Sequence, residues 1–177
     1  MVLRRDVLAA AAGGTSIALS GCLTAMGLAR TGHVSFKAIQ VAWLHEGRRY
    51  SNEVLFATDG GDDRPRGRVA EEYQGIVRSV DDVRVGDDLG RELERTFTDV
   101  GYIADICWAA GECRNPSVSR GEFDRLQFGD RAEVRFESPG MGVVDVYEGA
   151  EGDPGEWAEL ETFDLSERQA ENGIPIA

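Results

Sequence analysis

Residues 34–44, VSFKAIQVAWL, alternate between apolar and polar positions as a half-buried β-strand does. The apolar positions change phase at Ala38, so that those before it and those after it would face opposite sides. A β-bulge near Ala38 explains the change, because one extra residue reverses the side on which the following residues lie. HEGRR at 45–49 has the composition of a turn, and YSNEVLFAT at 50–58 that of a returning strand. The pattern therefore predicts a hairpin.

Two later segments carry apolar residues at helical spacing. The first, Val69–Val80, is interrupted by Gly75, which weakens a helix. The second, Leu89–Val100, has apolar residues along one face. Asp87 is its expected N-cap and Gly101 its expected C′ residue. The spacing predicts two helices in this part of the chain.

The second half of the chain alternates short apolar segments with turns rich in glycine. YIADICW at 102–108 predicts a buried strand, and Ser119 with Glu122 predicts a capping box for a short helical turn. Further strands are expected at 132–136, 143–148 and 157–165, with a short polar helix at 166–173. The elements predict an α+β fold, a mainly antiparallel sheet with one or two packed helices. A small, mostly-β barrel or sandwich is the alternative.

The N-terminus has a different pattern. Arg4 and Arg5 precede 23 residues, 7–29, without a charged side chain. A basic segment followed by a mildly apolar one is typical of a secretory signal. The stretch RRDVL has two arginines, one variable residue and two apolar residues. It resembles the signal of proteins exported by the twin-arginine route, which carries folded proteins.

The uncharged segment contains LSGC at residues 19–22. This motif resembles the lipobox of prokaryotic lipoproteins. The resemblance implies that the thiol of Cys22 receives a lipid and that the chain is cut before it. Residues 1–21 would then be a signal peptide, 22–33 a lipid-anchored tether and 34–177 a single globular domain. An uncleaved anchor is the alternative, because 23 residues can span a bilayer. The segment's many small residues make it a poor one.

The chain is acidic, with 19 lysine and arginine residues against 32 aspartate and glutamate residues and a net charge of −13. Lys37 is the only lysine. An acidic excess with almost no lysine resembles the proteins of extreme halophiles, since molar salt screens the repulsion between carboxylates. Together with the signal, it resembles a haloarchaeal twin-arginine lipoprotein. No basic patch is present, so nucleic-acid binding is not expected.

Cys107 and Cys113 remain once Cys22 is assigned to the lipid. Outside the membrane such a pair can be oxidised, and we expect a structural disulfide between them. Free thiols, a metal site or a redox pair are the alternatives. A zinc site lacks further ligands at short spacing, and a thioredoxin-like pair has two intervening residues rather than five.

Other candidate sites are weaker. A blue-copper site needs two histidines and a thiolate, and neither His33 nor His45 has the usual spacing from a cysteine. The acidic loop 59–63, DGGDD, could hold calcium, but its spacing matches no known calcium loop. We therefore predict no metal and no cofactor.

No nucleophile elbow, phosphate loop, zinc-helix motif or dinucleotide fingerprint occurs in the sequence. No catalytic residue is predicted. We expect a lipid-anchored protein on the extracytoplasmic face of the cell membrane, with membrane lipid as partner through Cys22. Its domain would bind an unknown protein or small molecule, or support the envelope. The alternative is a surface hydrolase that uses paired carboxylates.

Overall fold

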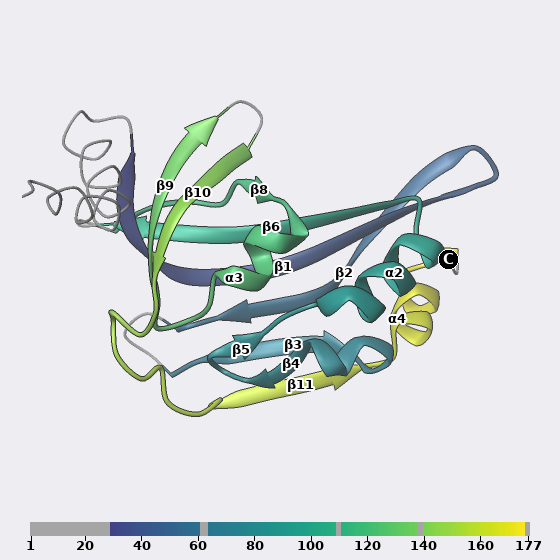
Figure 1. The fold of residues 1–177 in the computed structure, drawn as a ribbon. Coiled ribbons are helices and arrows are strands. Elements are labelled where there is room, and N and C mark those ends of the chain that lie inside the picture. Colours follow the sequence, from purple (N-terminus) through teal and green to yellow (C-terminus); the bar gives the residue numbers. More distant parts are fainter. Residues whose placement is uncertain (1–28, 61–63, 109–110, 138–139, 176–177) are drawn as a thin grey trace, which may run out of the picture.

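The computed structural model describes residues 29–60, 64–108, 111–137 and 140–175. Within these residues, the main sheet has nine strands and a separate hairpin has two, and short helices pack beside them (Figure 1). Most pairs of neighbouring strands run antiparallel. The fold is α+β with an open, mainly antiparallel sheet, as the sequence predicts.

The long strand β1 (Arg30–His45) organises the sheet. It pairs with β2 (Arg48–Thr58) and with β6 (Asp99–Trp108), and its first residues, 30–33, pair with β9 (Arg131–Glu137). β1 therefore begins four residues before the predicted strand and includes residues expected in the tether.

The bulge of β1 lies three residues before the predicted position: Ser35 is its extra residue against β6, whereas beside Ala38 the extra residue is Val54 of β2. The register of β1 against β2 shifts between Ile39 and Gln40, and its register against β6 shifts between Val34 and Phe36. Irregularities on both sides of Ala38 bend the strand, which curves strongly at its start (Figure 1). The bend lets one strand pair with β9 at one end and with β2 at the other.

The predicted hairpin between β1 and β2 closes with two residues. Glu46 and Gly47 have φ angles of 49° and 77°. Positive φ at both central positions is the geometry that matches the twist of the flanking strands. The hairpin tip extends beyond the rest of the sheet in Figure 1 and carries Leu44, which is 61% exposed.

The remaining strands extend the sheet on both sides of β1. They are β3 (Arg66–Ala70), β7 (Glu112–Arg114), β8 (Ser117–Val118), β10 (Gly140–Tyr147) and β11 (Glu159–Phe163). β3 pairs with β2, β10 with β9, and both β7 and β8 with β6. β11 runs parallel to β3. The separate hairpin consists of β4 (Val77–Ser79) and β5 (Asp82–Val83).

The helix predicted over Val69–Val80 is wrong. The segment forms the end of β3, the 3₁₀ helix η1 (Glu71–Ile76) and then β4. Val69 pairs with Leu55 of β2, and Gly75 lies in the 3₁₀ turn. Sheet pairing fixes the first residue and glycine weakens the α-helix, so only a short turn remains.

The second predicted helix is present but shifted. α2 spans Gly86–Thr96, and Phe97 after it is already extended. Val100 and Gly101, expected at the helix end, belong to β6, where Val100 pairs with Val41 of β1. Pairing with the central strand therefore ends the helix earlier than its apolar spacing suggests.

The N-terminus of α2 is capped from another helix. Asp87 lies in the first turn and is not the cap. Asp124, in α3 (Arg120–Arg125), accepts hydrogen bonds from the backbone N–H groups of Val85 at 2.8 Å and Gly86 at 3.1 Å. A carboxylate at a helix N-terminus satisfies free N–H groups and complements the helix dipole. This contact fixes α3 against α2.

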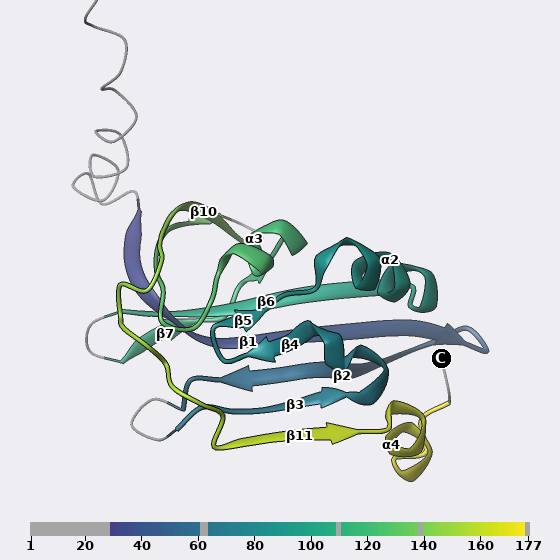
Figure 2. The ribbon, with the colours of Figure 1, turned by 60° about the horizontal axis from the view of Figure 1, so that its bottom comes forward.

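Both short helices have local caps, of which the sequence predicts the first. Ser119 and Glu122 form the capping box of α3. The last helix, α4 (Leu165–Glu171), begins after Asp164, whose side chain accepts from the N–H of Glu167 at 2.8 Å. Figure 2 shows α2, α3 and the β4–β5 hairpin beside the long strands, and α4 beyond the end of β11. Apolar side chains fill the space between these layers.

Candidate functional site

The predicted export and lipidation residues, Arg4, Arg5 and Cys22, lie outside the described residues. In the part of the chain that the structure describes, no helix combines the length and the apolar character needed to cross a membrane. The described residues with chemical interest are therefore the cysteine pair, a buried lysine and two polar pockets.

Cys107 and Cys113 form the predicted disulfide. Cys107 lies in β6 and Cys113 directly opposite in β7, with their Cα atoms 4.1 Å apart. Because antiparallel pairing places the two side chains next to each other, the bond joins adjacent strands. Cys107 is buried, with 6% of its surface exposed, whereas Cys113 at the sheet edge is exposed.

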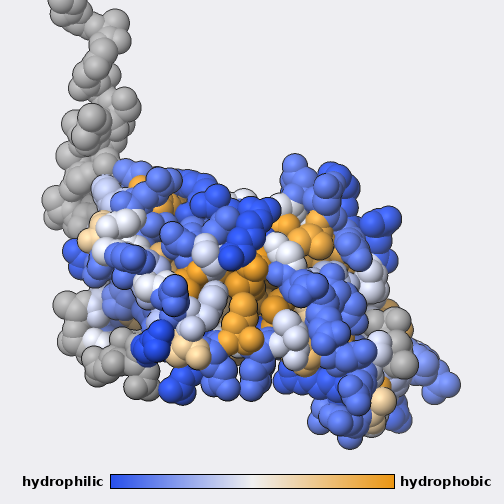
Figure 3. Space-filling model, turned by 90° about the horizontal axis from the view of Figure 1, so that it is seen from below, coloured by the Kyte–Doolittle hydropathy of each residue, from blue (hydrophilic) through white to orange (hydrophobic). Residues whose placement is uncertain are grey.

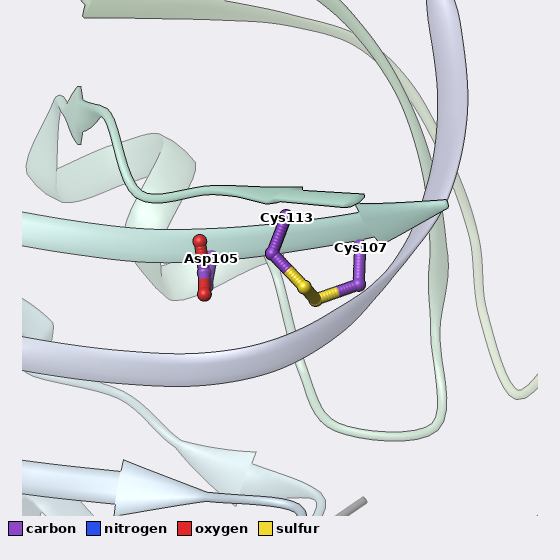
Figure 4. A group of neighbouring side chains, drawn as sticks. All are labelled: Asp105, Cys107 and Cys113. Carbon is purple, nitrogen blue, oxygen red and sulfur yellow. A yellow bond between two sulfur atoms is a disulfide. The ribbon is translucent and has the colours of Figure 1, made fainter. Parts of the chain in front are cut away.

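Asp105 lies beside this disulfide (Figure 4). It precedes Cys107 by two residues in β6, so both side chains lie on the same face of the strand. Its carboxylate and the two sulfurs lie within 4.8 Å of one another. Asp105 Oδ1 is buried and has no hydrogen-bond partner among the described residues. Burial raises the pKa of the Asp105 carboxyl.

Ser35 of β1 completes this group, with its Oγ 2.9 Å from Cys107 Sγ. Asp105, Cys107 and Cys113 are also the one trio in the described ranges whose geometry could hold a metal ion. Each sulfur is already bonded to the other, so the disulfide excludes metal ligation by these thiolates in this state.

Lys37, the chain's only lysine, is completely buried under α3. Its Nζ donates hydrogen bonds to the backbone carbonyls of Val83 at 2.6 Å, Phe123 at 2.8 Å and Leu126 at 2.5 Å. Three acceptors match the three donors of an ammonium group. Burial lowers the pKa of Lys37 well below its ordinary value, and nearby Asp124 opposes that shift. The side chain ties β1 to β5 and α3.

Sequence reasoning identified Lys37 as unusual but not as buried. Lys37, Ala38 and Ile39 are consecutive buried residues, so both faces of β1 are covered at this point. The partners of Lys37, 46 to 89 residues away along the chain, leave no local signal. Its hydrogen bonds are all to backbone carbonyls, so this side chain has a structural role.

Two polar pockets adjoin the loop between β10 and β11. One, of about 400 Å³, opens between this loop and residues near β5 and α3, including Arg84, Arg125 and Asp130. The other, of about 710 Å³, includes His33, Asp59 and Arg64. Gly152, Asp153 and Pro154 line both pockets. Side chains of both charges surround them, which suits a polar ligand better than an apolar one.

Figure 3, viewed from the side of β11, shows hydrophobic surface in the middle of an otherwise hydrophilic face. The exposed large apolar residues in the described ranges are Leu44, Tyr147 and Leu160. They lie on β1, β10 and β11 respectively, so they do not follow one strand.

The residues weighed for other metal sites are not brought together. His33 and His45 lie near opposite ends of β1, which separates them by about 40 Å of extended strand. His33 Nε2 is 4.0 Å from an oxygen of Asp59. Residues 61–63 of the acidic loop lie outside the described residues.

No protein-family model, curated protein or solved structure matches this chain.

Proposed function

We propose that this protein is exported by the twin-arginine route and held on the extracytoplasmic face of the cell membrane by a lipid on Cys22. The observation that carries the proposal is the LSGC motif at 19–22, within the uncharged segment that follows Arg4 and Arg5. Ala29, at the start of the described domain, is buried. It comes seven positions after Cys22, a reach of about 25 Å when extended. The domain would therefore lie close to the membrane surface.

The cysteine pair supports an extracytoplasmic location. Cys107 and Cys113 are bonded, and disulfides persist mainly in oxidising compartments. Export of a folded chain is compatible with this bond, because the two strands that it joins already place the cysteines opposite each other.

We further propose that the anchored domain binds a partner or supports the envelope rather than catalysing hydrolysis. Asp130 and Glu133, the acidic residues of the described ranges that are buried as whole residues, already take part in the fold. Asp130 accepts from the N–H groups of Gln127 at 3.1 Å and Gly149 at 2.9 Å. Glu133 accepts from the hydroxyl of Tyr147 at 3.2 Å. The polar pockets beside residues 152–154 offer a binding surface that needs no such carboxylate pair.

Cell fractionation of the full chain in a haloarchaeal host tests the anchoring. The wild type should be found in the membrane fraction, with its N-terminus at Cys22 and the mass of a lipid added. Cys22→Ser should carry no lipid and should either be released or accumulate as uncleaved precursor. An unlipidated wild-type chain with an intact N-terminus in the membrane would contradict the lipoprotein proposal.

The export route is tested separately with Arg4→Lys combined with Arg5→Lys. This variant should remain in the cytoplasm, where Cys107 and Cys113 should react as thiols because that compartment is reducing. Arg30→Lys changes an arginine outside the signal and is the matched control, with export and disulfide formation unchanged. Normal export of the double variant would exclude the twin-arginine route.

A further inference from the structure

The two sulfurs of the disulfide differ in accessibility. Cys113 lies on the exposed edge strand β7, and Cys107 is buried in β6. A thiolate breaks a disulfide by attacking one sulfur, and the other sulfur leaves with the electron pair. A thiolate arriving from solvent reaches Cys113, so Cys107 is the leaving sulfur.

The leaving sulfur has groups that can stabilise it. The Ser35 hydroxyl, 2.9 Å from Cys107 Sγ, can donate a hydrogen bond to a thiolate there. The Asp105 carboxyl lies within 4.8 Å of both sulfurs, beside them along β6 (Figure 4). Its Oδ1 is buried and has no hydrogen-bond partner among the described residues. A carboxyl without a partner in this position is available to exchange a proton with the sulfur.

Burial strengthens the hold of the Asp105 carboxyl on its proton. Burial raises its pKa, so it stays protonated to a higher pH than an exposed aspartate. The charged and titratable residues of the paired strands beside this part of β6 are His33 and Lys37 on β1 and Glu112 and Arg114 on β7. His33 pairs in register with Cys107, so the experiment must separate any effect of His33 titration from that of Asp105.

We propose that Cys107 and Cys113 form a thiol–disulfide exchange site that accepts two electrons from dithiol substrates, with Asp105 as the proton donor to the leaving sulfur. This site does not depend on the lipid anchor. It goes beyond the structural role that the sequence predicts for the disulfide.

The exchange proceeds in two balanced steps. One substrate thiol gives its proton to water and, as a thiolate, attacks Cys113 Sγ; the bond to Cys107 breaks, and Cys107 Sγ receives the electron pair and the proton of Asp105. The second substrate thiol then gives its proton to the Asp105 carboxylate and attacks the substrate sulfur on Cys113. Cys113 leaves as a thiolate and takes a proton from water. The substrate becomes a disulfide and loses two electrons and two protons, which the cysteine pair gains.

Reduction by dithiothreitol tests the site in the full folded chain at molar salt. All variants carry Cys22→Ser, so that the pair holds the only remaining cysteines among the three in the chain. Reduction is quenched by alkylation and measured by mass, and circular dichroism shows whether the fold is retained. A reduced peptide with two cysteines serves as a second substrate and tests whether polypeptide dithiols also react. We expect the pair to be reduced without unfolding. Reduction only under denaturing conditions would overturn the proposal.

Asp105→Asn tests the proton donor. We expect it to slow reduction about tenfold or more at low pH. The reduction rate divided by the concentration of dithiothreitol thiolate should also depend less on pH than it does in the wild type. Glu112→Gln removes a neighbouring exposed carboxylate and controls for charge, and His33→Gln controls for titration of His33. An unchanged rate and pH profile in a folded Asp105→Asn variant would overturn the role of Asp105. Should Asp105→Asn fail to fold, Ser35→Ala provides the second test, with a severalfold slower rate expected and an unchanged rate contradicting the proposal.

The direction of attack has its own measurement. Glutathione disulfide should modify the free Cys113 of Cys107→Ser much faster than the free Cys107 of Cys113→Ser. In the wild type, the mixed disulfide trapped during reduction should lie on Cys113. A mixed disulfide trapped on Cys107 would overturn the proposed geometry.

Discussion

The Lys37 ammonium lies over the ring of Phe123, 4.1 Å from its centre, and donates a 2.8 Å hydrogen bond to the carbonyl of the same residue. A cation over an aromatic face gains electrostatic stabilisation, and more so when water is excluded. Phe123 is itself completely buried. One side chain thus joins the central strand to α3 through both the ring and the backbone of that helix.

Lys37→Met should destabilise the protein by about 3 kcal/mol, because three buried carbonyls would lose their donor. Methionine has a similar length but cannot donate a hydrogen bond. Gln40→Met, at an exposed position of the same strand, is the matched control and should change stability little. Chemical denaturation at molar salt measures both. Equal stability of Lys37→Met and the wild type would show that the three hydrogen bonds make no net contribution to the free energy of unfolding.

Asp124→Ala should lower the free energy of unfolding by about 1 kcal/mol, because the N–H groups of Val85 and Gly86 would lose their acceptor. Asp88→Ala removes a carboxylate from the first turn of the same helix, where the side chain is exposed. Its effect should be smaller, since an exposed ion pair contributes little. If both variants lose the same stability, the effect is one of charge near the helix and not of capping.

Asp105→Asn should stabilise the protein near neutral pH. The folded-state pKa of Asp105 is raised by burial, so the folded state holds the proton more tightly than the unfolded state, whose pKa is about 3.9. Below the unfolded pKa both states are protonated and the charge has no effect. As pH rises through the folded pKa, the buried charge increasingly destabilises the wild type, and asparagine lacks this charge.

Thermal melts from acidic to neutral pH measure this effect. The difference in Tm between Asp105→Asn and the wild type should grow as pH rises. Glu94→Gln, an exposed change on α2, is the control and should not reproduce that dependence. A stabilisation that is the same at all pH values would mean that the Asp105 carboxyl does not titrate differently on folding.

The features that the sequence predicted are local ones. The capping box of Ser119 and Glu122 depends on residues three positions apart, and the β1–β2 turn on two adjacent residues. The helix predicted over Val69–Val80 does not form because the start of this segment pairs with β2. The apolar spacing within the segment carries no information about that partner. Pairing with distant strands therefore sets the secondary structure of that segment, and it also sets where α2 ends.

The sequence predicts the disulfide of the candidate site but not all of the residues around it. The disulfide followed from two cysteines in one short segment, and the i, i+2 spacing of Asp105 and Cys107 could have placed both on one face of the strand. Ser35, 72 residues from Cys107, could not be placed beside it without the pairing of β1 with β6. The caps and contacts of Asp124 and Lys37 are equally non-local.

The location of Lys37 bears on salt dependence. Since the only lysine is buried, arginine supplies the positive charge of the described surface. Burial is the main cause of the raised pKa of Tyr73, and the negative charges of Glu92 and Glu72 raise it further. Both glutamates therefore lie near Tyr73, on the same part of the surface. Glu53, by contrast, accepts from Arg68 at 2.8 Å.

Stability should fall as salt is lowered from molar to about 0.1 M, where the Debye length grows from about 3 to about 10 Å and carboxylates repel one another over longer distances. Glu72→Gln with Glu92→Gln removes two like charges and should raise Tm more at low salt than at high salt. Glu53→Gln breaks an attractive pair and should do the opposite, with its largest loss of Tm at low salt, where screening is weakest. Thermal melts over this salt range compare the three proteins. A wild-type Tm that does not change with salt, or the same salt response in all three, would show that repulsion between surface carboxylates does not set the stability of this domain.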